Sequence, residues 1–243
     1  MERITKSDRF AIQNADNIQL FSASTPNGIK AAACLEEISL IRQVHDGFTY
    51  EPHSVDIRHG ESHQQDFKKI SPNGKIPAII DFHGPEGKEV KVFESGCILL
   101  YLAEKYDVLI PKEPRQRVET MKWLFWGSSS ISVQFKLFGF YYKYCPQGLP
   151  YCIARYSKEC HRLLSVVENQ LQSHGMHWIV GEFYTIADIS IWPWVYALHE
   201  NYGDAITAVF GELKQYPYTK AWYSRCMARP GSQRSLEVCP FLN

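Results

Sequence analysis

The pattern of apolar and polar residues divides the chain into two parts of different character. Between residues 18 and 106, short apolar runs of strand length alternate with segments of helical spacing, in the order β-α-β-(α)-β-β-α. From residue 116 onward, apolar residues recur at three- and four-residue intervals with charged residues between them, which predicts helices. The fold class that follows is α/β plus all-α, with one part after the other.

Turn-forming residues mark where the strands of the first part begin and end. Strands are predicted from Ile18, over 48–56, over 78–80 and over 90–93. The turn at 84–87 joins the last two strands as a hairpin, so the four-stranded sheet is expected to be mixed rather than fully parallel. The polar stretch 58–69 is predicted to be an irregular helix or a loop.

A charged segment bracketed by Pro111 and Pro114 separates the two parts. The predicted organisation is a polar N-terminal tail over 1–17, a first domain over 18–106, a linker over 107–115 and a helical domain over 116–243. The tail lacks the apolar core of a signal peptide, and no apolar run approaches the length of a membrane span. We therefore expect a cytoplasmic protein with no membrane partner.

Composition and charge narrow the function classes. The 243 residues include 26 basic and 26 acidic side chains, a balance that gives no general attraction to nucleic acid. The seven cysteines form no C-x-x-C pair, which argues for reduced thiols rather than a disulfide framework or a thioredoxin-type dithiol. The nine histidines have no metal-ligand spacing, so no metal site is expected.

The loop after the first strand is the first candidate site. Thr25 is a good N-cap, and Pro26 suits the first position of the helix that follows. A helix that opens at the carboxyl end of a buried strand presents free N–H groups and a positive dipole end, which can hold a carboxylate, a phosphate or a thiolate. By itself, however, Thr-Pro-Asn-Gly is also ordinary turn chemistry.

Two further segments point to a peptide-like ligand. Pro77 interrupts a strand-like run, and a cis bond there would turn the N–H and C=O of Ile76 outward. At the start of the last helix of the first part, Glu94 can pair with an ammonium, while Ser95 and the helix N–H groups can bind a carboxylate. A ligand with an α-amino acid head and a peptide backbone satisfies both segments.

Six segments carry a resemblance to a known family. They are TPNGIK (25–30), SPNGKIPAIID (71–81), FESGCILLYLAEK (93–105), WLFW (123–126), PYCIARY (150–156) and TIADISIWPWV (185–195). In these the chain resembles the glutathione transferases, and most of all the Nu-class branch of bacterial disulfide-bond oxidoreductases and fungal nitrogen-regulator-like proteins. The resemblance implies a thioredoxin-like first domain, a helical-bundle second domain, reduced or oxidised glutathione as the bound substrate, and a homodimer.

The resemblance also implies how the glutathione sulfur is held. Thr25 would contact it through its hydroxyl and Asn27 through its amide. Other classes activate the thiol with a serine near this loop, so Ser22 and Ser24 stay open as alternatives. A thiolate close to donors and a helix N-terminus has a lowered pKa, and bound glutathione can supply both sulfurs of a disulfide exchange without a protein cysteine.

The rest of the tripeptide has its own implied partners. Ile76 would pair with the cysteinyl backbone, and Lys75 would lie near the glycyl carboxylate. Glu94 and Ser95 would bind the γ-glutamyl group. Arg155 would reach a glutathione carboxylate from the helical domain, although it equally fits a solvated helix face.

The chain departs from the bacterial pattern at 127–144, which borders the second-substrate pocket in this family. Serines and an aromatic run occupy it, either as an apolar pocket wall or as tertiary packing. The co-substrate therefore cannot be carried over. The sequence predicts a glutathione-dependent disulfide oxidoreductase. The alternatives are a transferase that conjugates electrophiles or reduces hydroperoxides, and a glutathione-binding regulatory protein with little catalysis.

Overall fold

The computed structural model describes residues 10, 12, 17–42, 48–173 and 177–242. The chain forms two compact units, one made of 1–102 with 231–243 and the other of 103–230. The domain limits 18–106 and 116–243 stay a prediction. The compact units differ from these predicted limits in one respect, because the C-terminal segment 231–243 belongs to the first unit.

The first unit is built on a four-stranded sheet with the order β2-β1-β3-β4. β2 runs parallel to β1, whereas β3 pairs antiparallel with β1 and β4 antiparallel with β3, so the expected mixed sheet is confirmed. The strands are β1 Ile18–Ser22, β2 Tyr50–Ser54, β3 Ala78–Asp81 and β4 Val90–Phe93.

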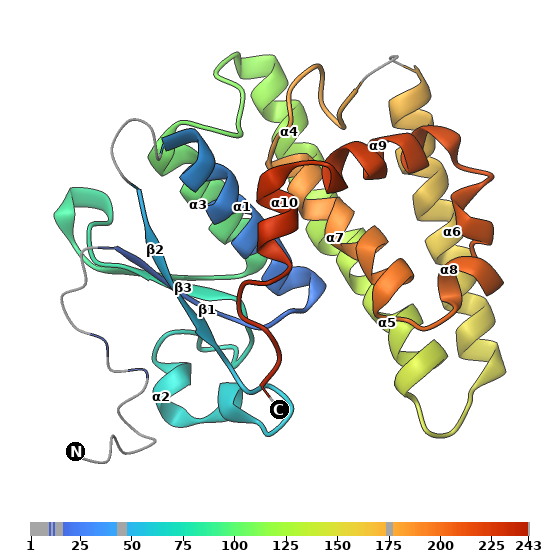
Figure 1. Cartoon of the computed structure of the whole chain (residues 1–243), viewed down its shortest axis with the longest axis horizontal. Coiled ribbons are helices and arrows are strands. Elements are labelled where there is room, and N and C mark those ends of the chain that lie inside the picture. The colour runs from blue at the N-terminus through green and yellow to red at the C-terminus, as the bar shows by residue number, and fades with distance from the viewer. Residues whose placement is uncertain (1–9, 11, 13–16, 43–47, 174–176, 243) are drawn as a thin grey trace. The chain divides into compact units, whose positions relative to one another are not determined.

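Helices cover both faces of this sheet, as Figure 1 shows for α1 and α3 on one side and α2 on the other. Their bounds are α1 Pro26–Arg42, α2 Gln65–Lys68 and α3 Ser95–Tyr106. Because successive strand residues face opposite sides, one set of side chains meets α1 and α3 and the other meets α2. Phe67 of α2 belongs to a buried cluster with Phe21 and Ile80. Short 3₁₀ turns occupy Glu61–His63 and Pro85–Gly87.

Phe10 lies within the predicted polar tail, yet its side chain is only 5% exposed. Its ring centroid is 5.8 Å from that of Phe21 and 5.3 Å from that of Phe67, both in edge-to-face geometry. The apolar surface on the α2 side of the sheet is thus extended by a residue from the start of the chain. Most of the segment 1–17 lies outside the described residues.

The second unit is helical, as the apolar spacing predicts. Its helices are α4 Pro114–Trp126, α5 Ser132–Gly139, α6 Pro150–Ser173, α7 Ile186–Glu200, α8 Ala205–Ala208 and α9 Pro217–Met227. Turns of π-helix at Gly127–Ile131 and Phe140–Tyr144 flank α5. The last helix, α10 Pro230–Ser235, leads back to the first unit. No helix in the described part of the chain is both long and apolar enough to cross a membrane.

Candidate glutathione site

Strand register brings the three candidate segments to one end of the sheet. β1 is antiparallel to β3 with Phe21 opposite Ala78, so the carboxyl end of β1 lies beside the start of β3. β3 is antiparallel to β4 with Ala78 opposite Phe93, so the end of β4 lies there as well. The loop after β1, the Ile76–Pro77 bond and the segment that begins with Glu94 are therefore neighbours although they are far apart in the sequence.

Thr25 caps α1, as the sequence predicts. Its hydroxyl oxygen accepts a hydrogen bond from the backbone N–H of Gly28 at 3.1 Å, and its carbonyl accepts from Ile29 at 2.8 Å. A hydroxyl has one proton and two lone pairs, so the cap leaves the proton available to donate. Thr25 thus combines a hydroxyl donor with the positive end of a 17-residue helix.

Gly28 allows the helix to approach this loop closely. A Cβ at this position would lie 2.0 Å from the carbonyl oxygen of Ala23 and 2.6 Å from Oγ of Ser22. Ser22 is only 1% exposed beneath it, and its hydroxyl has no hydrogen-bond partner in the described structure. Ser24 donates its hydroxyl to the carbonyl of Cys239 at 3.2 Å. Neither serine is placed as a sulfur donor by these contacts.

Asn27 links the first and third segments. The Ser95 hydroxyl donates to the Asn27 amide oxygen at 3.4 Å, which connects the first turns of α1 and α3. Ser95 is buried and Asn27 is half-buried. Because the amide oxygen accepts from Ser95, the amide NH₂ group is the part of Asn27 that can donate to a ligand.

The second segment has the predicted backbone form. The Ile76–Pro77 peptide bond is cis. Lys75, just before it, has an exposed side chain, and its carbonyl accepts from the Ser71 hydroxyl at 2.8 Å. The segment is thus fixed by Ser71 on one side and by β3 on the other.

Glu94 occupies the left-handed region with a φ of 70°, and its carbonyl accepts from the N–H of Ile98 at 2.9 Å as α3 begins. A non-glycine residue rarely adopts this conformation, which marks the position as constrained by its surroundings. Its side chain is exposed, and the residue directly precedes the free N–H groups at the start of α3.

Lys30 is a buried ionisable residue near these segments that was not predicted from the sequence. It lies on α1, three residues after Asn27, and its side chain is fully buried. Burial lowers the pKa of Lys30 to about 7, and the nearby charge of Glu94 acts in the opposite direction. The sequence gives one signal for it, a lysine within the apolar face of an Ala-rich helix.

Arg155 lies on α6 in the second unit with an exposed side chain. The contacts that join the other candidate residues all lie in the first unit, and none of them involves Arg155.

Four of the described thiols, those of Cys34, Cys97, Cys160 and Cys239, are poorly suited to act as nucleophiles. Burial raises the pKa of Cys34, of Cys160 and of Cys239, the last to about 11. Cys97 is exposed, but partial burial and the charge of Glu94 raise its pKa as well. Among the described residues, no group of three His, Cys, Asp or Glu side chains is arranged to hold a metal ion.

The aromatic run at 135–142 divides into two sets. Phe135 and Phe138 are fully buried, and Tyr142 donates its hydroxyl to Asp204 at 2.7 Å, so these three serve tertiary packing. Phe140 is 47% exposed, and Tyr141 stacks on Tyr156 with ring centroids 5.3 Å apart. Of these rings, Phe140 is the exposed one, whereas Tyr141 and Tyr142 are half-buried.

Two protein-family models match the chain. The model of the glutathione S-transferase N-terminal domain matches residues 24–104, and the model of the C-terminal domain matches residues 152–230. The chain belongs to the glutathione S-transferase family. The thioredoxin-like first domain and the helical second domain, both expected from the sequence motifs, are thereby confirmed.

Similar proteins indicate which branch of the glutathione S-transferase family the chain resembles most. The chain is 38% identical over 221 residues to the disulfide-bond oxidoreductase YfcG of Escherichia coli K12, which covers 90% of this chain and 94% of the relative. A glutathione transferase family member from Pseudomonas fluorescens, solved with two glutathione bound, is 37% identical with a TM-score of 0.86, covering 96% of this chain and 98% of that one. A glutathione transferase from Pseudomonas putida, solved with one glutathione disulfide per subunit, is 35% identical with a TM-score of 0.85 over 96% of each chain.

Proposed function

We propose that the protein is a glutathione-dependent disulfide-bond oxidoreductase in which bound glutathione supplies the reacting sulfur. The observation that carries this proposal is the group of hydrogen-bond donors at the N-terminus of α1, which lies in the same chain as four thiols whose pKa is raised, those of Cys34, Cys97, Cys160 and Cys239. The Thr25 hydroxyl and the Asn27 amide would stabilise a glutathione thiolate there. The name of the YfcG relative, and the glutathione disulfide bound to the Pseudomonas putida protein, support the same chemistry.

The remaining candidate residues would hold the tripeptide. Glu94 would pair with the γ-glutamyl ammonium, and Ser95 with the N–H groups of α3 would bind the adjacent carboxylate. The backbone of Ile76, which precedes the cis bond to Pro77, would pair with the cysteinyl unit. Lys75 would lie near the glycyl carboxylate, and Arg155 would bind a glutathione carboxylate from the helical part.

The proposed reaction has two thiol–disulfide exchanges. The thiolate of bound glutathione attacks one sulfur of a substrate disulfide, which forms a mixed disulfide and releases one substrate thiolate. The thiolate of a second glutathione then attacks the glutathione sulfur of the mixed disulfide, which forms glutathione disulfide and releases the second substrate thiolate. Two glutathione molecules are oxidised and one substrate disulfide is reduced, and the released thiolates take up the two thiol protons.

A side-by-side assay tests this function. Purified protein is given reduced glutathione and, in separate reactions, a small symmetrical disulfide, an aryl halide and an organic hydroperoxide. The proposal expects the highest kcat/KM with the disulfide. Faster turnover of the halide or the peroxide would instead favour a conjugating or peroxidase enzyme. Retention on glutathione resin without turnover of any substrate would favour a regulatory binding protein.

We also propose that the protein is a cytoplasmic homodimer. Val118 and Phe125 on α4 are 64% and 57% exposed and lie seven residues apart, which places two large apolar side chains on one face of the helix. A second copy is the occupant that the family resemblance implies. Light scattering on the purified protein would give twice the chain mass of 28.0 kDa if this is correct, and the single-chain mass if it is not.

A further inference from the structure

The C-terminal segment, 231–241, packs on the first unit, next to the loop that carries Thr25. We propose that this segment, called the strap below, fixes the sulfur-binding loop, and that Ser24 is the positioning residue through which it acts. This inference rests on the proposed function for its catalytic consequence but not for its structural one.

One hydrogen bond joins the strap to the loop. The Ser24 hydroxyl donates to the backbone carbonyl of Cys239 at 3.2 Å, across 215 positions of sequence. Ser24 immediately precedes Thr25, so a restraint on Ser24 limits where the Thr25 hydroxyl can move. The backbone N–H of Thr25 also donates to Ala23 at 2.6 Å, which makes the loop a tight turn around Ser24.

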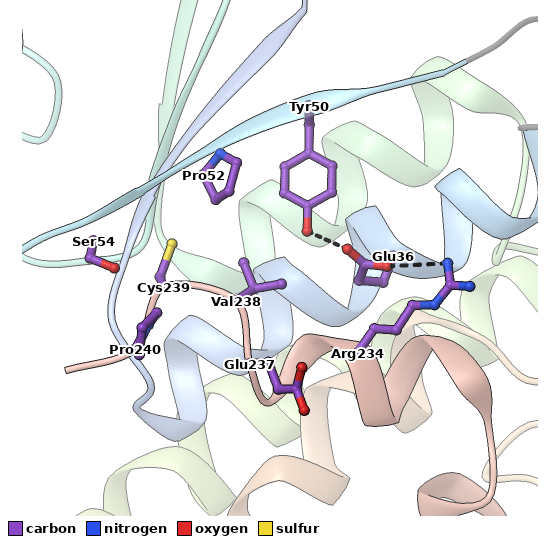
Figure 2. A pocket seen from close by; sticks show the side chains of 9 residues that line it. All are labelled: Glu36, Tyr50, Pro52, Ser54, Arg234, Glu237, Val238, Cys239 and Pro240. Atoms are coloured by element: carbon purple, nitrogen blue, oxygen red, sulfur yellow. Dashed lines mark hydrogen bonds and ion pairs between the residues drawn. The ribbon is translucent and has the colours of Figure 1, made fainter.

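Cys239 is constrained by its backbone conformation and by its burial. Its φ is 53° and its side chain is only 3% exposed, a conformation that a non-glycine residue keeps only when its surroundings impose it. Figure 2 shows its sulfur pointing from the strap towards the strands. Burial raises the pKa of this thiol to about 11, although the backbone N–H groups of Ser22 and His53 and the Ser54 hydroxyl act against this rise. The thiol therefore packs against the ends of β1 and β2 as a neutral group.

Contacts on each side of Cys239 in the sequence hold the strap against the first unit. Before it, Glu36 of α1 accepts from the Tyr50 hydroxyl at 2.5 Å and forms an ion pair with Arg234 at 3.9 Å, as drawn in Figure 2. After it, the guanidinium of Arg58 lies 4.4 Å from the centroid of the Phe241 ring. Because both ends are anchored to the first unit, the Cys239 carbonyl is a fixed acceptor for Ser24.

The start of the strap is close to α1 as well. A Cβ at Gly231 would lie 2.7 Å from the carboxylate of Glu37, so only glycine fits there without a shift. The pocket in Figure 2, about 520 Å³ in volume, lies between the strap, α1 and β2. None of the candidate glutathione residues lines it, which separates the strap from the ligand site and favours a positioning role.

Two variants test the strap. Ser24→Ala removes the donor, and a chain that ends at Glu237 removes the acceptor carbonyl together with Phe241. Ser24→Thr keeps a hydroxyl and is the matched control. Three readouts are compared with the wild type: kcat and KM for disulfide reduction, the pH titration of the bound glutathione thiolate by its ultraviolet absorbance, and hydrogen exchange of the amides at 25–29.

The proposal expects the same result from both disruptive variants. The kcat value falls about tenfold because the thiolate loses a well-placed donor, while KM for glutathione changes less. The pKa of the bound thiol rises, amide exchange at 25–29 accelerates, and combining the two changes adds nothing further. Ser24→Thr restores wild-type values.

Three results would overturn the proposal. One is unchanged amide exchange in Ser24→Ala. Another is loss of activity in Ser24→Ala but not in the shortened chain, which would make Ser24 a direct sulfur ligand. The third is an unchanged thiol pKa in both variants. If the wild type reduces no disulfide, the proposed function fails, but the amide exchange still decides the strap. If the shortened chain does not fold, the Ser24→Ala and Ser24→Thr pair decides it.

Discussion

The hydroxyl of Ser95 donates to the amide oxygen of Asn27, which links the residue proposed to contact the glutathione sulfur with one proposed to bind the γ-glutamyl group. The contact fixes the orientation of the Asn27 side chain and aims its NH₂ group as a donor. Ser95 has a single hydroxyl proton, so it cannot donate to Asn27 and to a ligand carboxylate at the same time. The free N–H groups at the start of α3 can bind the carboxylate while this contact persists, and the proposed bond from Ser95 to the carboxylate would require its hydroxyl to turn away from Asn27.

Asn27→Asp should raise the pKa of the bound glutathione thiol. The substitution keeps the oxygen that accepts from Ser95 but replaces the donor NH₂ with a second carboxylate oxygen, which repels a thiolate. We expect a rise of about one to two pH units, measured by the absorbance of the thiolate across pH. Asn27→Ala should give a smaller rise, since it removes the donor without adding charge. Identical titrations for Asp and Asn at this position would rule out the contact with sulfur.

Thr25→Val should lower kcat/KM for disulfide reduction by about 10- to 150-fold, because a hydrogen bond to a charged group contributes about 1.5–3 kcal/mol. It should also cost about 1 kcal/mol of folding stability through the lost N-cap, measured by denaturant unfolding. Thr25→Ser keeps the hydroxyl and should retain most of both. If the Val variant loses stability but keeps full activity, Thr25 acts only as an N-cap and does not contact the glutathione sulfur.

Glu94→Gln should raise KM for glutathione by about tenfold or more and leave kcat within about twofold, because the lost ion pair acts on ground state and transition state alike. Steady-state kinetics at varied glutathione measure both. The control is Glu89→Gln. Glu89 is an exposed carboxylate just before β4, and it forms an ion pair with Lys91 at 3.1 Å. Equal KM values for the two variants would count against the ammonium contact.

Lys30 should make folding stability depend on pH. Burial lowers its pKa from 10.5 to about 7 in the folded protein, so between these values the unfolded chain binds more protons than the folded one. Raising the pH through this window therefore favours folding, by about 1.4 kcal/mol per pH unit. Below about pH 7 both states are protonated and the dependence ends.

Lys30→Met isolates this contribution, because the other titrating groups are the same in both proteins. The stability of the wild type minus that of the variant should rise from pH 7 to pH 9 in denaturant unfolding. A constant difference over this range would show that Lys30 keeps an ordinary pKa.

Local chemistry was enough to predict several structural features of the candidate site. Thr25 and Pro26 form the capped start of α1 through their own side chains. The proline at a strand start made a cis bond at Pro77 plausible, and the bond is cis. Hairpin and strand patterns also predicted the mixed sheet, whose register brings these segments together. The cap and the hairpin turn are set by residues close in sequence, whereas the register joins strands that are far apart.

Features that depend on distant partners were not predictable in the same way. The burial of Lys30 is decided by what packs against α1, and the burial of Phe10 by Phe21 and Phe67. The contact between Ser24 and Cys239 spans 215 positions and leaves no periodic signal. Spacing along the chain reports which face of an element is apolar, but not which remote segment covers it.

The central claim is that glutathione, rather than a protein cysteine, supplies the reacting sulfurs. Its most direct test is a variant in which the buried cysteines 34, 160, 226 and 239 become alanine and the more accessible 97, 145 and 152 become serine. A companion variant carries only the three serine substitutions, in case the full set does not fold. Circular dichroism checks both folds. The account predicts that the folded variants reduce a small disulfide with glutathione at a kcat within about threefold of the wild type; loss of that activity in a folded variant would contradict it.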